Sequence, residues 1–261
     1  MNLSLEGKNA VICGSSQGIG LAIAAELALL GANCTLMARN EETLQAAVKT
    51  LDIALRQQHG YLVADFTNTE NVKQAIRQHV QHTPVHILVN NTGGPAPGSV
   101  LTATEEAFTQ AFKQHLIVNQ ILAQAVVPSM KEAGYGRIIN IISTSIRIPI
   151  TGLAVSGTVR GAVAVWSKIL ANEVGQFNIT VNNILPGSTK TQRLESLIQN
   201  TAQKRGVSRE VVEHEMQQDI PMKRFGEASE LGAVAAFLAS PAASYVNGVS
   251  IPVDGGKTGA L

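Results

Sequence analysis

The sequence has almost no net charge, few cysteines and no long apolar run. Twenty basic and nineteen acidic residues give a formal net charge of +1 over 261 residues. Such a balance provides no field that would attract nucleic acid or an anionic membrane. No run reaches the roughly 18 apolar residues that a membrane helix needs, and the N-terminus lacks a basic segment followed by a long apolar stretch. We therefore expect a soluble, cytoplasmic protein that binds neither nucleic acid nor membrane.

Several motifs that would indicate other chemistries are also missing. The two cysteines, Cys13 and Cys34, lie in the apolar runs AVIC and ANCTLMA, which favours buried free thiols over a disulfide and fits a reducing compartment. The sequence has no H-E-x-x-H pair and no complete G-x-x-x-x-G-K-[ST] loop, so metallohydrolase and kinase functions have no motif. His79, His82 and His86 are close in sequence, but Pro84 interrupts them, and we predict a polar helix end and no metal.

Apolar runs of strand length alternate with longer helical patterns. Most of the runs are too continuously apolar for a surface strand, which is typical of a parallel sheet covered on both faces. The expected strands are residues 9–13, 33–38, 60–66, 85–91, 136–143, 179–187 and 248–256. The expected helices are Ile19–Leu30, Glu41–Gln58, Thr69–His82, Thr104–Ala133 and Leu153–Val174. This alternation predicts an α/β fold, with one domain over residues 1–261 built on a doubly wound parallel sheet.

Residues 190–224 interrupt this alternation with a polar, charged segment that carries small apolar sets at 194–198 and 211–216. Ligands of doubly wound sheets bind beyond the carboxyl ends of the strands. We expect the segment to form a helical flap over a binding site; the alternative is a surface excursion without function.

A glycine-rich turn follows the first expected strand. The sequence CGSSQGIG has glycines at positions 14, 18 and 20. Glycine there permits positive φ, lets backbone amides approach a pyrophosphate and lets the next helix pack closely. The spacing G-x-x-x-G-x-G differs from the G-x-G-x-x-G fingerprint, but a strand before it and a helix after it support a phosphate cradle. A purely structural turn is the alternative.

This turn and the motifs that follow it resemble the short-chain dehydrogenase/reductase family, in particular its 3-oxoacyl-(acyl carrier protein) reductases, from about Leu5 to Gly256. The matching segments are GSSQGIG (14–20), Ala64–Asp65, NNTGG (90–94) in place of N-N-A-G, GRIINIIS (136–143), ITVNNILPGSTKT (179–191) and YVNGVSIPVDGG (245–256). The resemblance implies a Rossmann-type fold and a nicotinamide dinucleotide cofactor. It assigns cofactor contacts to Gly14, Ser16, Gly18, Ile19, Gly20, Asp65, Phe66, Asn91, Gly93, Pro186, Gly187 and Thr189. Gln17, Arg39 and Arg160 are further candidates for contact with the cofactor.

The end of the second strand indicates which dinucleotide is bound. An acidic residue there would repel a 2′-phosphate, but the sequence LMARN has Ala38 at that position and Arg39 beside it. A guanidinium pairs with a phosphate and gains nothing comparable from two hydroxyls, which favours NADP(H). A lone arginine is often solvated surface, and Gln17 stands where many NADP-preferring relatives have a second basic residue. NAD(H) is therefore the alternative.

The resemblance also locates four catalytic positions. Relatives have a serine, a tyrosine, a lysine four residues after the tyrosine, and an asparagine one helix earlier; here the residues are Ser143, Ser156, Arg160 and His115. An aliphatic hydroxyl is a far poorer acid than a phenol, so Ser156 should not donate the proton. Arg160 can position a ribose but stays charged. His115 is the group at these positions with an ordinary pKa near neutrality, although a helix histidine is more often packing or capping.

No other tyrosine has the spacing to return to the site, because Tyr61, Tyr135 and Tyr245 lie elsewhere. Three functions stay open: an atypical oxidoreductase acting on a small carbonyl or alcohol, an enzyme with a non-redox carbonyl reaction, and a noncatalytic nucleotide-responsive protein. We favour the first, with His115, Ser143 or an ordered water supplying the proton. The long helices at 104–133 and 153–174 carry apolar residues on more than one face, and the family resemblance suggests a homotetramer or a dimer.

Overall fold

Seven parallel strands form a single sheet in the computed structural model, which describes residues 1–259. The strands are β1 (Asn9–Cys13), β2 (Asn33–Ala38), β3 (Gly60–Val63), β4 (Ile87–Asn90), β5 (Gly136–Ile141), β6 (Ile179–Pro186) and β7 (Ser250–Val253). Their order across the sheet is β3-β2-β1-β4-β5-β6-β7. The chain order reverses between β1 and β4, and such a switch point opens a crevice at the carboxyl ends of the strands.

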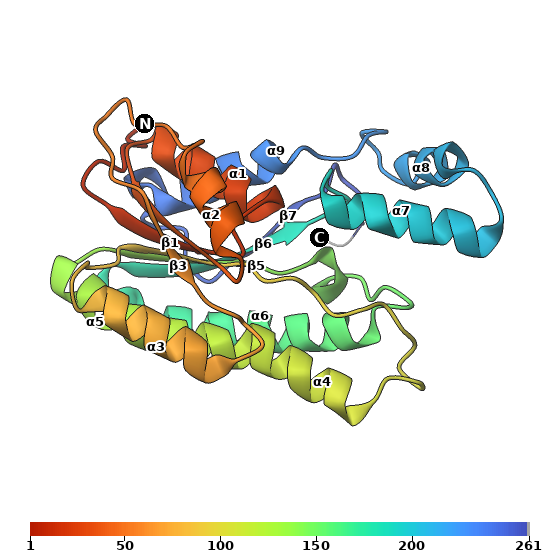
Figure 1. Ribbon diagram of the computed structural model, residues 1–261, viewed down its shortest axis with the longest axis horizontal. Helices are drawn as coiled ribbons and strands as arrows, with labels where there is room; N and C mark the ends of the chain where they lie inside the picture. Colours follow the sequence, from red (N-terminus) through yellow and green to blue (C-terminus); the bar gives the residue numbers. More distant parts are fainter. Residues whose placement is uncertain (260–261) are drawn as a thin grey trace.

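Helices cover both faces of the sheet (Figure 1). One layer consists of α1 (Gly18–Leu29), α2 (Glu41–Val48) and α9 (Ala228–Ala239), and the other of α3 (Thr69–Val80), α5 (Val118–Ala133) and α6 (Ala154–Val174). Each layer buries its own apolar cluster against the strands, for example Ile23 and Leu231 on one face and Ile76 and Leu122 on the other. The predicted single-domain, doubly wound α/β fold is thus confirmed. Among the helices of residues 1–259, none has the length and hydropathy needed to cross a bilayer.

Helix α2 is shorter than its sequence predicted. It ends at Val48, whereas the pattern indicated a helix as far as Gln58. The chain after it turns inward: Leu51 is buried, and the Gln57 side chain donates a hydrogen bond to the carbonyl of Ala28 (2.7 Å). These contacts outweigh the local helical preference, so the prediction for residues 49–58 was wrong.

The helix expected at 104–133 is divided into three parts. Helix α4 (Glu105–Phe112) passes into a π-helical turn at Lys113–Ile117 and then into α5. Short π-helical segments are rare and occur often at functional sites. Strands β3 and β7 are also shorter than predicted, and α9 was not among the expected helices.

The segment predicted to be a flap contains two helices, α7 (Gln192–Arg205) and α8 (Arg209–Gln218). They extend beyond the carboxyl end of the sheet, away from the two helical layers (Figure 1). A separate apolar cluster joins them; its members are Leu194, Ile198, Ala202, Val212, Ile220 and Phe225. Because this cluster does not merge with the main core, the two helices form a subsidiary unit at the mouth of the crevice.

Candidate functional site

A cavity of about 1060 Å³ lies between the carboxyl ends of the strands and helix α7. Segments that follow each of the seven strands contribute to its wall. The predicted site residues that line it are Gly14, Ser16, Gln17, Gly18, Ile19, Arg39, Asp65, Phe66, Asn91, Gly93, Ser143, Ser156, Arg160, Pro186, Gly187 and Thr189. Gly20 and His115 are buried and do not line the cavity. Residues far apart in the sequence therefore converge on one cavity.

The turn between β1 and α1 has the geometry of a phosphate cradle. Gly14 and Gly18 adopt positive φ angles of 57° and 59°. A Cβ on Gly14 would collide with the carbonyl oxygen of Asn91, and one on Gly20 with that of Gly14. Helix α1 begins at Gly18 without a side-chain cap from Gln17, which leaves its first amides available. These residues fit the pyrophosphate of a dinucleotide, because free amides and the helix dipole favour an anion there.

Arg39 and Asp65 line the cavity just after the ends of β2 and β3. Thr67 donates two hydrogen bonds to Asp65 Oδ1, from its backbone amide (2.9 Å) and from its hydroxyl (2.8 Å). These bonds and the nearby charge of Arg39 hold the pKa of Asp65 below its usual value. Arg39 forms no ion pair with a carboxylate of residues 1–259. Its guanidinium is thus available to an anionic ligand.

Thr92, which follows β4, and His115 form a hydrogen-bonded pair. Thr92 lines the cavity, and its Oγ1 lies 2.6 Å from His115 Nδ1. His115 belongs to the π-helical turn and is 2% exposed, and its Nε2 has no partner among the described residues. Burial, followed by the charges of Arg160 and Arg193, lowers the pKa of His115 to about 3. The imidazole is therefore neutral at pH 7, which differs from the near-neutral pKa that the sequence suggested.

Arg160 projects from α6 into the buried wall next to this pair. Its Nη1 donates to the carbonyl of Ile141 (2.5 Å), and its Nη2 donates to the carbonyl of Thr92 (3.3 Å). Burial, and secondly the charge of Arg193, lowers the pKa of Arg160 to about 10, so it remains a cation at neutral pH. Thr92 thus contacts both His115 and Arg160, through its hydroxyl and its carbonyl respectively.

Ser143 and Ser156 also face the cavity. Ser143 follows β5, and its Oγ accepts a hydrogen bond from the Ser145 amide (3.1 Å). That bond fixes the side chain and leaves its hydroxyl hydrogen free to donate to a substrate oxygen. Ser156 lies in the first turn of α6, and no hydrogen bond joins its side chain to another of the described residues.

Two residues that the sequence motifs did not indicate, Thr92 and Arg193, also line the cavity. Thr92 stands where the N-N-A-G motif has alanine, and its hydroxyl contacts His115. Arg193, on the first turn of α7, lines the cavity and reaches the loop after β4: a Cβ on Gly94 would lie 2.5 Å from its Nη1. The unusual Thr92 was visible in the sequence, whereas nothing in the local pattern around Arg193 indicated a contact with Gly94.

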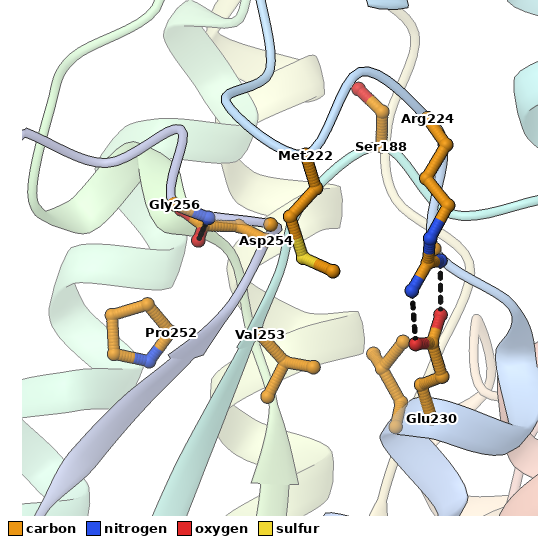
Figure 2. A pocket seen from close by; sticks show the side chains of 11 residues that line it. Ser188, Met222, Arg224, Glu230, Pro252, Val253, Asp254 and Gly256 are labelled. Carbon is orange, nitrogen blue, oxygen red and sulfur yellow. Dashed lines mark hydrogen bonds and ion pairs between the residues drawn. The ribbon is translucent and has the colours of Figure 1, made fainter.

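A second, smaller cavity of about 450 Å³ lies near the ends of β6 and β7 (Figure 2). Arg224 and Glu230 stand at its wall, joined by two hydrogen bonds of 2.8 and 2.7 Å. Met222 and Val253 contribute apolar surface. Because its arginine is already neutralised and its remaining charged residue is Asp254, this cavity presents no free cation of residues 1–259 to an anionic ligand.

The remaining chemical groups add no further site. Cys13 and Cys34 are free and buried, and burial raises the pKa of each thiol to about 12. Within residues 1–259 no group of three His, Cys, Asp or Glu side chains is placed to hold a metal ion. Of the three clustered histidines, His86 accepts a hydrogen bond at Nδ1 from the Asn9 amide (3.0 Å).

Comparison with known proteins agrees with this geometry. A family model described as enoyl-(acyl carrier protein) reductase matches residues 14–258. The chain is 34% identical to an uncharacterized oxidoreductase, MT0954, of Mycobacterium tuberculosis, over 97% of this chain and 93% of the relative. It is 30% identical to the NADPH-dependent reductase BacG of Bacillus subtilis, over 96% and 97%. The structure of L-sorbose reductase from Gluconobacter frateurii, complexed with NADPH and L-sorbose, superposes with a TM-score of 0.94 at 30% identity, with all of both chains covered. The chain belongs to the short-chain dehydrogenase/reductase family of oxidoreductases.

Proposed function

We propose that this protein is an NADP(H)-dependent oxidoreductase that acts on a small carbonyl or alcohol substrate. The observation that carries the proposal is the single cavity that joins the glycine turn, Arg39 and Ser143. One end suits a pyrophosphate and a 2′-phosphate, and the other offers hydroxyls to a substrate oxygen. The name of BacG and the NADPH complex of L-sorbose reductase support the choice of dinucleotide.

Arg39 is the residue we assign to the 2′-phosphate. It follows β2 directly, lines the cavity and has no acidic partner in residues 1–259. A guanidinium binds a phosphate by charge-assisted, paired hydrogen bonds. Asp65, Phe66 and Asn91 would then contact the adenine side, and Pro186 to Thr189 the nicotinamide side.

The nicotinamide, when bound in its reduced form, supplies a hydride to the carbonyl carbon, and the oxygen must gain a proton to give the alcohol. We infer that Ser156 and Arg160 occupy the positions of the tyrosine and lysine of relatives, and that Ser156 does not replace the phenol. Ser143 donates a hydrogen bond to the substrate oxygen, and Arg160 positions the ribose.

The proton reaches the oxygen through the Thr92–His115 pair in this proposal. Thr92 has its hydroxyl at the cavity wall and an imidazole behind it at 2.6 Å, a pairing that Ser156 lacks among the described residues. A neutral imidazole can give a proton from Nδ1 while Nε2 takes one from a water molecule that hydrogen-bonds to this buried, otherwise unpartnered atom, so His115 need not be charged. In this route Thr92 passes its hydroxyl proton to the substrate oxygen, and His115 then gives a new proton to Thr92.

Calorimetric titration with NADPH and NADH tests the cofactor assignment. We expect NADPH to bind at least tenfold more tightly, and Arg39→Asp to abolish or reverse the preference. Arg77→Asp, the same change on the exposed end of α3, is the matched control and should leave both affinities unchanged. Equal affinities that Arg39→Asp does not alter would refute the assignment.

Absorbance at the NADPH band, followed against a broad carbonyl panel, tests the redox reaction itself. Oxidation of NADPH in the presence of any compound of the panel supports the redox reaction. Tight NADPH binding without turnover of any compound would favour a non-redox or noncatalytic function.

We also propose self-association, through the exposed apolar face of α6. Val165 and Ile169 are 64% and 54% exposed there, and Phe112 at the end of α4 is 42% exposed. Exposed apolar side chains grouped on long helices favour contact with a second copy. Light scattering at micromolar concentration should give a dimer or tetramer mass, and a monomer mass would contradict the proposal.

A further inference from the structure

Two arginines are buried within residues 1–259, and they differ in how their charge is accommodated. Arg137 is 2% exposed and donates hydrogen bonds to the carbonyls of Ser240, Gly136 and Asn178. Its guanidinium also lies 4.2 Å from the centre of the Tyr135 ring. Arg137 lies outside both cavities, and its guanidinium already has partners in these carbonyls and the tyrosine ring.

Arg160 is 9% exposed but has fewer partners. It donates to two carbonyls, one of them at 3.3 Å, and no carboxylate of residues 1–259 pairs with it. A buried cation without a counter-ion is costly to maintain. Since Arg160 lines the large cavity, an anionic ligand can supply the missing charge.

Arg193 places a second cation at the same end. It comes from the flap helix α7, contacts Gly94 and likewise has no acidic partner within the described part of the chain. It is close enough to Arg160 and His115 to depress the pKa of both. Two like charges held near one another favour an anion between them.

The rest of the wall does not neutralise this pair. Asp65 is the one acidic residue that lines the cavity in residues 1–259, and it lies at the end that we assign to the adenosine. Two further cations on the wall are already paired, Lys190 with Glu227 (2.5 Å) and Lys257 with Asp219 (3.8 Å). The unneutralised positive charge at the catalytic end thus belongs to Arg160 and Arg193.

We propose, on the basis of the oxidoreductase function above, that the substrate is an oxo acid or hydroxy acid whose carboxylate binds between Arg160 and Arg193. The carbonyl or alcohol carbon then lies beside Ser143 and Thr92. Planar guanidinium groups match the two oxygens of a carboxylate, which gives orientation as well as affinity. Arg193 closes over the bound acid from α7, so the flap contributes directly to substrate selection.

The test compares small oxo acids with their methyl esters, which have the same carbonyl but no negative charge. Each compound is titrated calorimetrically into protein loaded with NADP⁺, which cannot reduce it. At least one acid should bind tenfold or more tightly than its ester. Arg193→Gln should weaken that acid 10- to 100-fold and leave the ester unchanged, as expected for loss of a charge-assisted contact. Arg193→Lys should restore part of the affinity.

Lys204→Gln provides the matched control, since it removes one positive charge from the exposed far end of the same helix, outside the cavity. It should not change binding of the acid. Equal binding of acids and esters by protein that binds NADPH normally would overturn this inference and leave the proposed function standing. A loss of NADPH affinity in Arg193→Gln equal to the loss for the acid would assign Arg193 to the cofactor and also overturn it. Failure of the unmodified protein to bind NADPH would instead refute the proposed function.

Discussion

The large and the small cavity share one wall residue, Ser188, on the segment that leads from β6 into the flap. In the small cavity Arg224 is held by two hydrogen bonds to Glu230 (Figure 2). In the large cavity Arg39, Arg160 and Arg193 have no carboxylate partner among residues 1–259.

The two cavities thus differ in whether their arginines are paired with a carboxylate of the protein or remain available to a ligand. An exposed arginine with an acidic neighbour is already satisfied and attracts little else. Arginines that line a cavity without such a neighbour retain their field, which is stronger where burial lowers the local dielectric. We therefore assign the function to the large cavity by the unpaired arginines in its wall and not by its volume alone.

The largest effect should come from the polar pair at the wall of the large cavity. Thr92→Val keeps the shape of the side chain but removes the hydroxyl that joins the cavity to His115. We expect Thr92→Val and His115→Ala each to lower kcat by about 100- to 10,000-fold, as for loss of a group in acid–base catalysis. Ser156→Ala should change kcat by less than about tenfold. Steady-state kinetics with saturating NADPH and an active substrate measures all three.

Arg224→Gln in the small cavity is the control for this series and should leave kcat unchanged. An inactive Ser156→Ala combined with active Thr92→Val and His115→Ala would show that the hydroxyl at position 156 carries the proton. The proposed route through Thr92 would then be abandoned.

A second, smaller effect concerns acid stability. His115 has a pKa of about 3 in the folded protein, mainly because it is buried, against about 6.5 when unfolded. As the pH falls below 6.5, the unfolded chain takes up a proton that the folded chain does not, so the free energy of unfolding decreases until about pH 3. Between pH 7.5 and pH 5 this one residue should lower the free energy of unfolding by about 2 kcal/mol.

His115→Asn lacks this titrating group and should lose correspondingly less stability over the same interval. Urea denaturation at both pH values measures the difference. His79 and His86, whose pKa values burial also lowers, are unchanged in the variant, so their contributions cancel. Identical pH dependence in the two proteins would show that the imidazole of His115 is readily protonated in the folded state.

The sequence predicted most of the fold because the strands are marked by local patterns. β1 and β2 were predicted to the residue, since continuous apolar runs end there at a glycine turn and at Arg39. The end of α2 could not be predicted in this way, because the contacts of Leu51 and Gln57 that draw the chain inward are made with distant residues. The π-helical turn likewise has no local signature distinct from the helices on either side of it.

The candidate site was predictable where the family motifs reach it and not elsewhere. Ser143 and Arg160 were located by the family's motif spacing and Arg39 by its place at the end of the second strand, and all three line the cavity. The pKa of His115 depends on its burial and on two arginines distant in the sequence, and spacing carries no information about that. Arg193 entered the site only through the position of α7, which is a tertiary property.

The smallest effect should come from Arg224→Gln, which removes the paired cation of the small cavity. Arg224 and Glu230 are each more than 40% exposed, and exposed ion pairs contribute little to stability. We expect the Tm to fall by less than about 2 °C. The clearer change should be in Glu230, because hydrogen bonding to Arg224 lowers the pKa of that carboxyl to about 2. NMR titration should show this pKa rise toward its ordinary value of about 4.3 in the variant.

The NADPH affinity of the Arg224→Gln variant should stay the same, because the small cavity lies outside the proposed cofactor path. A marked loss of NADPH affinity would mean that the paired arginine also serves the ligand, and the distinction between the two cavities would fail.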